Sequence, residues 1–364
     1  MTSKKQEILY ASADTFEGMC HELLQQLANR NNILKITVFN LPADNKEYYA
    51  NLCLLKDSIN RLFNENTPLI AYVAQQCLTA SMAAEVTYLP EDENIQYEHH
   101  EGYTLLHGDG FCELITEGIT PHSLDGSIRE QSAEIFAQLQ QIITKNDFKI
   151  SDIYRQWNYI EQITSIHDGR QNYQDFNDAR SRFYNNTEWA NGYPAATGIG
   201  TSCGGVMIEV YAIKGEKIVN HAIDNPLQIS AHNYSQKVLT GKSDEKERTT
   251  PKFERARLVG NTLYISGTAA IKGEDSLALN SATEQTTETM YIIKQLVAAE
   301  NIPIETKESN YTLLRVYIKN GKDAPEIIKF MNENYPDVCK HYLEADVCRP
   351  ELLVEIEGTA TVKL

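Results

Sequence analysis

The sequence predicts an α+β protein in which one β-α-β-α-β unit occurs three times within a single chain of 364 residues. Two observations support this fold class. Alternating strand and helix patterns recur in three successive stretches, and internal repeats of this length indicate repeated structural units. Each stretch also closes with a short apolar strand that carries a glutamate, at Glu85, Glu209 and Glu355.

The C-terminal stretch shows the pattern most clearly. Residues 261–267 form a strand that ends in glycine, and a helix with apolar residues at helical spacing covers 290–297. A second strand follows at 312–318, and a second helix begins near Asp323, a good N-cap. After Pro350 the closing strand starts at Leu352. The order is therefore β-α-β-α-β.

The middle stretch, about 101–215, repeats this order. Residues 103–108 occupy the place of the 261–267 strand, and 129–143 form the first helix. The next strand lies within 153–163, the second helix covers 172–184, and 206–211 close the unit.

The first stretch, about 7–89, is the shortest copy. It opens with a strand at 8–12, continues through a helix at 21–28 and a strand at 34–39, and has a second helix over 52–62. Residues 83–86 close it.

These copies divide the chain into four segments. A degenerate first unit covers 1–95, a middle unit covers 96–216, and a C-terminal unit covers 253–364. The segment 217–252 contains an Asp-Asn-Pro turn and a polar run, so we expect a connector with little regular structure.

The closing strands place a carboxylate beside apolar neighbours. In the last copy Leu352, Val354 and Ile356 face one way, whereas Glu355 and Glu357 face the other. Desolvation raises the pKa of a half-buried glutamate and suits it to general acid catalysis. The alternative is an amphipathic strand with solvated glutamates. We expect Glu85, Glu209 and Glu355 to be equivalent, and the first two to be structural acids.

Charge and cysteine content restrict the function. The net charge of -17 argues against binding nucleic acid, but it allows a small anionic ligand where arginines cluster. No segment is long and apolar enough to span a membrane, and the N-terminus lacks a signal peptide pattern. The seven cysteines show no metal-binding spacing and predict a reduced, cytoplasmic protein.

Two signatures resemble a known fold. Residues 263–267 (LYISG) and 354–357 (VEIE) are similar to the paired signatures of the RidA/YjgF fold, which is chorismate-mutase-like. In that family three subunits form a trimer with ligand clefts at their contacts. Three units in one chain imply a pseudo-trimer, either as a monomer or as a weak homo-oligomer.

A closer resemblance is to the chorismatase branch of this superfamily. It rests on six pieces spread over roughly the last 200 residues: 157–159 (WNY), Tyr173 with Phe176 and Arg180, 225–228 (NPLQ), 251–256 (PKFERA), 266–270 (SGTAA) and 348–355. Members of this branch remove the enolpyruvyl group of chorismate. They yield pyruvate with either a dihydroxycyclohexadiene carboxylate or 3-hydroxybenzoate. The resemblance implies no metal and no cofactor.

The resemblance also implies roles for individual residues. Arginine forks match the two carboxylates of chorismate, and the candidates are Arg180, Arg255 and Arg349. The family assigns the acid to Glu355 and product selection to Cys348, for which a small buried thiol is the alternative. Tyr173 and Ala270 complete the expected substrate contacts. These residues predict one functional cleft between the middle and last units.

The sequence departs from the family pattern at four positions. Asn172 and Leu227 stand where arginine or a similar residue is usual, Ser235 replaces a proline, and Glu274 replaces a histidine. Cys348 together with Ala270 mixes features of the two product branches. Two other functions remain open: a RidA-like deaminase of 2-imino acids, and a non-catalytic protein that binds small carboxylates.

Overall fold

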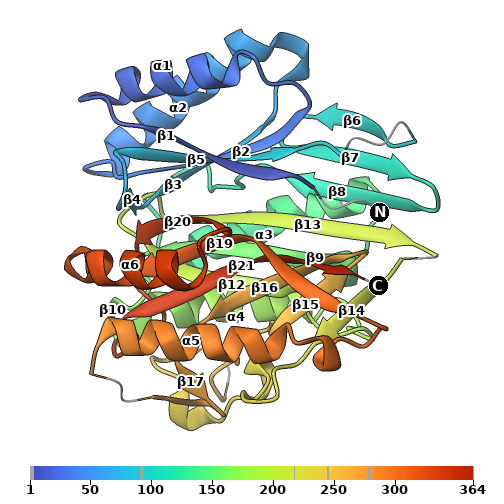
Figure 1. The fold of residues 1–364 in the computed structure, drawn as a ribbon, viewed down its shortest axis with the longest axis vertical. Coiled ribbons are helices and arrows are strands. Elements are labelled where there is room, and N and C mark those ends of the chain that lie inside the picture. Colours follow the sequence, from blue (N-terminus) through green and yellow to red (C-terminus); the bar gives the residue numbers. More distant parts are fainter. Residues whose placement is uncertain (1–3, 91–93, 217, 244–245, 278–279, 364) are drawn as a thin grey trace.

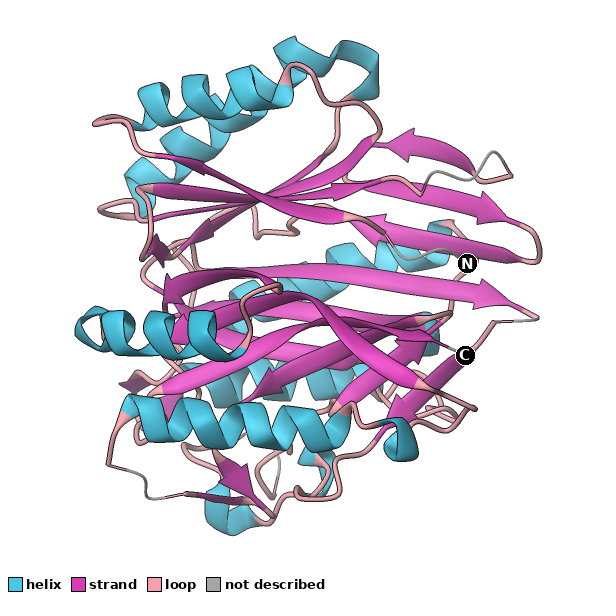
Figure 2. Ribbon diagram, viewed as in Figure 1, coloured by secondary structure: helices cyan, strands magenta, loops and turns pink. Residues whose placement is uncertain are grey.

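The computed structural model describes residues 4–90, 94–216, 218–243, 246–277 and 280–363. Three large sheets lie one against another, and helices cover their outer faces (Figures 1 and 2). Among the described residues, no helix combines the length and hydrophobicity needed to cross a membrane.

The first sheet has the strand order β1-β5-β2-β3, and α1 and α2 cover its outer face (Figure 1). Both helices begin at a side-chain cap, because Thr15 accepts from the Gly18 N–H and Asp44 from the Glu47 N–H. The elements are β1 (Gln6–Ala11), α1 (Phe16–Leu27), β2 (Ile33–Asn40), α2 (Asn45–Phe63), β3 (Leu69–Ala74) and β5 (Met82–Tyr88).

The second sheet has the order β12-β9-β13-β8-β7-β6. Ser127 and Glu130 form a capping box at the start of α3. The elements are β6 (Gln96–His100), β7 (Tyr103–Gly108), β8 (Phe111–Thr116), α3 (Ile128–Lys145), β9 (Ile153–Glu161), α4 (Asn172–Tyr184), β12 (Ala195–Thr201) and β13 (Val206–Gly215). The short pair β10 (Ile166–His167) and β11 (Arg170–Gln171) precedes α4.

The third sheet has the order β14-β15-β16-β21-β19-β20-β4. Its last member, β4 (Gln76–Cys77), comes from the first unit and pairs with β20, which ties the two sheets together. The other elements are β14 (Asn220–Ile223), β15 (Ala256–Val259), β16 (Thr262–Thr268), β17 (Ile271–Lys272), β18 (Asp275–Ser276), α5 (Ala282–Leu296), β19 (Glu308–Ile318), α6 (Ala324–Asn334), β20 (Cys339–Glu344) and β21 (Val354–Lys363).

The three sheets share one topology. In each, the closing strand (β5, β13 or β21) runs antiparallel to the second strand of its unit, and that strand pairs in parallel with the third. The predicted α+β class is confirmed, and each of the three units contains its predicted elements together with one further strand (β3, β12 or β20) before the closing strand. The unit boundaries stay predictions. The segment 217–252 is more regular than expected, because β14 lies within it and pairs with β15.

The assignment of residues 103–108 was wrong. The sequence pattern predicted this strand at the position of 261–267, but β8 occupies that position, since β8 pairs with β13 as β16 pairs with β21. Strand β7 lies one place further out, as β15 does. Two successive apolar strands form a hairpin here, and only their pairing shows which one is central.

The expected equivalence of Glu355 with Glu85 and Glu209 was also wrong. Glu85 pairs with Thr37, Glu209 with Trp157, and Glu357 with Arg315, each three residues after the start of its closing strand. The equivalents of Glu355 are Ala83 and Met207, one residue after those starts. Because side chains alternate with a period of two, a slip of two residues leaves the pattern unchanged. The sequence therefore could not distinguish Glu355 from Glu357.

Six buried charges meet where the three sheets pack together, and we call them the central ion cluster. Each sheet provides one acid and one base: Glu85 and Lys35, Glu209 and Arg155, Glu357 and Arg315.

The acids and bases of the cluster pair largely across sheets. Arg315 Nε lies 2.7 Å from Glu85 Oε2, and Arg315 Nη1 lies 3.1 Å from Glu357 Oε1. Arg155 pairs with Glu357, and Lys35 pairs with Glu209. Although burial opposes ionisation, the charge of Arg315 holds the pKa of Glu85 well below its usual range.

The central ion cluster predicts a large cost for removing one partner. Arg315→Met leaves Glu85 and Glu357 buried without their shared cation, which should lower the free energy of unfolding by about 3–5 kcal/mol. Lys329→Met is the control, since Lys329 pairs with Glu333 at 3.9 Å on the exposed face of α6 and should cost at most about 1 kcal/mol. Urea unfolding measures both. Equal losses would contradict a structural role for the cluster.

Candidate active site

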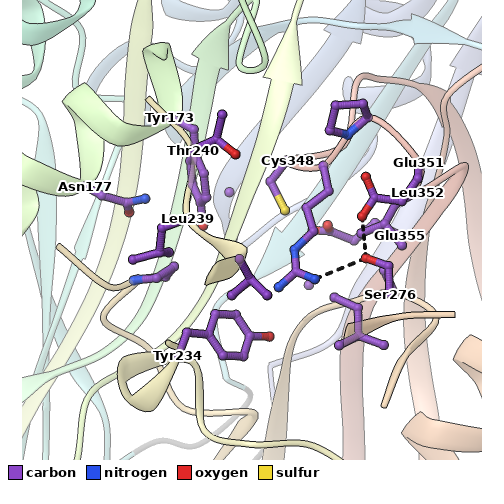
Figure 3. A pocket seen from close by; sticks show the side chains of 18 of the residues that line it. Tyr173, Asn177, Tyr234, Leu239, Thr240, Ser276, Cys348, Glu351, Leu352 and Glu355 are labelled. Atoms are coloured by element: carbon purple, nitrogen blue, oxygen red, sulfur yellow. Dashed lines mark hydrogen bonds between the residues drawn. The ribbon is translucent and has the colours of Figure 1, made fainter. Parts of the chain in front are cut away.

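A cavity of about 460 Å³ lies where α4 and β12 of the second sheet meet the third sheet and the segment 217–252. This volume is typical of small-molecule sites. Tyr173 and Asn177 lie on one side of the cavity, and Cys348 and Glu355 lie on the other (Figure 3). The described residues contain no cluster of His, Cys, Asp and Glu suited to hold a metal ion.

Glu355 lines this cavity from the start of β21 and is 5% exposed. Within the described structure its carboxyl group has no hydrogen-bond partner. Burial raises the pKa of Glu355 to about 8, the charge of Glu357 adds to this, and Arg155 and Arg255 oppose it. A Cβ atom at Gly267 would overlap Glu355 Oε1, so glycine is needed there for the carboxyl to fit. At neutral pH Glu355 is a protonated acid that faces an open cavity.

Arg255 and Arg349 line the same cavity. Arg255 is buried, and its Nη2 donates to the Tyr234 hydroxyl at 2.7 Å and to the Ile229 carbonyl. Arg349 Nη1 donates to the Glu274 carbonyl at 2.8 Å and to Ser276 Oγ at 3.1 Å. The Tyr234 ring lies 5.5 Å from one guanidinium carbon and 5.3 Å from the other.

Neither guanidinium forms an ion pair with a carboxylate of the described residues. This is unusual, because the chain carries 50 acidic and 33 basic side chains. A buried cation needs compensation. The arrangement therefore favours an anionic group bound between Arg255 and Arg349.

Arg180 does not line the cavity. It is 1% exposed on α4, and its Nη2 donates to Asn177 Oδ1 at 2.5 Å. Asn177 lines the cavity, so Arg180 influences the cavity only indirectly, by holding the Asn177 amide. Arg180 has no carboxylate partner among the described residues, and its Nε lacks a hydrogen bond there.

Tyr173 forms the wall opposite Glu355. Gly198 allows its ring to lie close to β12, since a Cβ at position 198 would lie 3.1 Å from Tyr173 Cε2. Burial raises the pKa of Tyr173 far above its usual value, and the Cys348 and Glu355 groups add to this effect. Its phenol is therefore neutral and suits it as a hydrogen-bond donor to a ligand.

Cys348 also lines the cavity, and it is partly buried. Burial, with the nearby Glu355, raises the pKa of its thiol to about 12. Because the thiolate is the nucleophilic form, Cys348 is not set up as a nucleophile. It is a small neutral group beside the acid. All seven cysteines of the chain are unpaired.

The structure corrects the choice of Ala270. This residue is fully buried and faces away, whereas Gly267, Ala269 and Ile271 line the cavity. Side chains of an extended segment alternate between its two sides, so the neighbour Ala269 presents its methyl group instead.

None of the four residues that depart from the family pattern lines the cavity. Asn172 and Leu227 lie outside its lining. Ser235 and Glu274 contact each other, because the Glu274 carboxylate accepts hydrogen bonds from Ser235 N and Oγ, both at 2.7 Å. The Glu274 carbonyl also accepts from Arg349. This pair fixes both Tyr234, the neighbour of Ser235, and Arg349.

The equivalent cleft between the first and second units is closed. Met207 occupies the position of Glu355 there. Tyr48 and Tyr72 line the small space that remains, which has a volume of about 10 Å³. That volume is at the lower limit for a single water molecule. The open cavity instead lies between the middle and last units, at the position predicted from the sequence.

The cavity is also lined by Tyr234, Asn177 and residues 237–240, which the sequence pattern did not predict. Tyr234 and 237–240 lie in the segment interpreted as a connector. One signal was available, since long irregular segments inside compact domains are usually functional.

The raised pKa of Glu355 predicts how its replacement changes stability. Between pH 4.5, the ordinary pKa of a glutamate, and about pH 8, folded Glu355 holds a proton that the unfolded chain releases, so its contribution to stability falls as pH rises. Glu355→Gln abolishes this loss. The free energy of unfolding of the variant should exceed that of the wild type by a few kcal/mol at pH 9, and the difference should shrink toward pH 5.

Urea unfolding at pH 5, 7 and 9 measures this difference. The exposed Glu333→Gln is the matched control and should show a nearly constant, small difference. A Glu355→Gln difference that does not depend on pH would contradict a protonated Glu355.

Comparisons with known proteins agree with this geometry. Residues 88–213 match the family model "Chorismatase FkbO/Hyg5-like, N-terminal", and 246–362 match "Endoribonuclease L-PSP". A 3-hydroxybenzoate synthase of Streptomyces hygroscopicus is 27% identical over 296 residues, which are 77% of this chain and 82% of that protein. A chorismatase of Streptomyces rapamycinicus is 28% identical over 222 residues, 56% and 62% of the two chains.

Among solved structures, a chorismatase crystal structure has the same fold. Its TM-score is 0.70 at 20% identity, and the match covers 99% of this chain and all of that one. The two family models together cover about two thirds of the sequence. Across these matched stretches the chain is similar to the chorismatases, and its overall fold is that of the chorismatase crystal structure.

Proposed function

We propose that this protein is an enzyme that removes the enolpyruvyl group of chorismate and releases pyruvate. One observation carries the proposal: a protonated buried acid, Glu355, faces a cavity whose arginines lack acidic partners. Chorismate is a dianion with an enol ether, so it needs both features. The names of the related proteins support the same substrate.

The reaction begins with proton transfer from Glu355 to the methylene carbon of the enolpyruvyl group. This step generates an oxocarbenium ion, and the Glu355 carboxylate left behind stabilises its positive charge. For hydrolysis, water then adds to the cationic carbon and returns a proton to Glu355. The hemiketal collapses to pyruvate and the ring alcohol, and the acid is ready for another turnover.

The cavity has places for both carboxylates. Arg255 and Arg349 provide one cationic side, with Tyr234 between them. Asn177, held by Arg180, and Tyr173 provide donors on the opposite side. Cys348 and Ala269 add small groups near the acid, and Ala269 takes the substrate-contact role expected of Ala270. We infer that the ligand is a small anionic carboxylate.

One chain supplies this whole cavity, so a monomer has a complete site. The related proteins include both a 3-hydroxybenzoate synthase and chorismatases. Identifying the ring product by NMR decides between the two product types. A cytoplasmic location stays a prediction from the sequence.

The central test is pyruvate release from chorismate by Glu355→Gln. Glutamine keeps the shape of the side chain but has no acidic proton, so turnover should fall by about two to four orders of magnitude. A coupled assay for pyruvate measures the rates, and exposed Glu333→Gln is the control. Full activity of Glu355→Gln would refute the role of the acid. Release of ammonia from a 2-imino acid, with no pyruvate from chorismate, would favour the deaminase instead.

A binding experiment tests the arginines separately from the chemistry. Arg255→Ala removes a charged hydrogen-bond donor from the wall, so the affinity for 3-hydroxybenzoate should weaken by about 1.5–3 kcal/mol. Arg180→Ala should weaken it less, because Arg180 acts through Asn177. Calorimetry measures both, with exposed Arg182→Ala on the same helix as the control. An unchanged affinity of Arg255→Ala would contradict this carboxylate site.

A further inference from the structure

Thr197 on β12 lies between the central ion cluster and Glu355, and its hydroxyl group is fully used. Thr197 Oγ1 donates to the Glu357 carboxylate. It accepts from Arg155 Nη2 at 2.8 Å and from the backbone N–H of Gly267 at 3.1 Å. A hydroxyl has one donor and two acceptor sites. All three are occupied, so the orientation of the side chain is fixed.

The orientation of the Thr197 side chain determines which groups lie next to the Glu355 carboxyl. A Cβ built at Gly267 would overlap Glu355 Oε1 and would lie 3.1 Å from Thr197 Cγ2, so the threonine methyl group is on the side of the acid. The Gly267 backbone N–H, next to that same carboxyl, is already donated to Thr197. Glu355 thus has an apolar neighbour and loses the adjacent donor that would stabilise its anion.

Glu357 adds an electrostatic effect of the same sign. Arg315 Nη1 at 3.1 Å and the Tyr317 hydroxyl at 2.6 Å donate to Glu357, as do Arg155 and Thr197. These four donors surround the Glu357 carboxylate and fix its position. It lies two residues from Glu355 on the same face of β21, and a nearby like charge disfavours ionisation.

We propose that Thr197 is a positioning residue that keeps Glu355 in its neutral, proton-donating form. The Thr197 hydroxyl accepts the hydrogen bond of the Gly267 N–H, and it also holds the Glu357 carboxylate in place near Glu355. Arg155 and Arg255 also act on Glu355 and oppose this effect, whereas Cys348 lies beside the acid and Tyr173 lies across the cavity. The kinetic consequence rests on the proposed function, whereas the protonation state of Glu355 does not.

The experiment compares Thr197→Val with Thr197→Ser. Valine keeps the shape but frees the Gly267 N–H, which can then donate to the Glu355 carboxylate. Serine keeps the hydroxyl. In the wild type, kcat/KM for pyruvate release should decline above about pH 8, as Glu355 loses its proton. In Thr197→Val the decline should begin about one pH unit lower. Its kcat/KM at pH 9 should then be about tenfold below that of the wild type at the same pH. Thr197→Ser should keep the wild-type pH profile.

A merely structural role gives a different result. If Thr197→Val lowers kcat/KM equally at every pH and the decline stays at the wild-type pH, the proposal is overturned. If the wild type releases no pyruvate from chorismate, the proposed function fails, but NMR of ¹³C-carboxyl glutamate still tests this inference. The Glu355 signal is assigned by its absence in Glu355→Gln. Its pKa should be lower in Thr197→Val than in Thr197→Ser, and equal values overturn the proposal.

The wild type provides a further test if Thr197→Val does not fold. The amide proton of Gly267 should shift little while Glu355 titrates, because the hydroxyl of Thr197 accepts it. A large downfield shift through that titration would show donation to the Glu355 carboxylate and would overturn the proposal.

Discussion

The rest of the structure depends on the central ion cluster. Three acids and three bases, one of each from every sheet, are buried where the sheets meet. Isolated burial of any one of them would be costly, so the cluster is favourable only when all three sheets pack in a single arrangement. Arg315 shows this most directly, because it pairs with Glu85 of the first sheet and with Glu357 of its own. The cluster thereby fixes the relative position of the three units.

The same cluster shapes the candidate active site. Glu357 belongs to the cluster, and Glu355 lies two residues earlier on the same face of β21. One carboxylate is surrounded by donors, whereas the other has none among the described residues and faces the cavity. Burial without a donor, together with the nearby Glu357, raises the pKa of Glu355. Burying Glu355 costs stability, and the same burial gives it a proton to donate at neutral pH.

The cleft between the middle and last units is open, whereas the one between the first and second units is closed. The position of Glu355 carries alanine in the first unit and methionine in the second. In the cleft around Met207, tyrosine side chains fill the space. The cleft between the middle and last units gains Tyr234 from the segment that joins these two units, and the Ser235–Glu274 pair holds that loop in place. This contact has both a buried acid and arginines without a carboxylate partner among the described residues.

The sequence by itself determined the α+β class and the threefold repeat, because periodicity is a property of short segments. Through its resemblance to the chorismatases it also singled out Glu355, Arg255 and Cys348, which line one cavity in the structure. Only the tertiary structure decided that Glu357, not Glu355, matches Glu85. It also decided that Ala269 rather than Ala270 faces the cavity, that Arg180 acts through Asn177, and that Tyr234 belongs to the site. These are matters of strand register and of packing between distant segments. An alternating pattern with a period of two looks the same after a slip of two residues, so the partners across the sheet must be known.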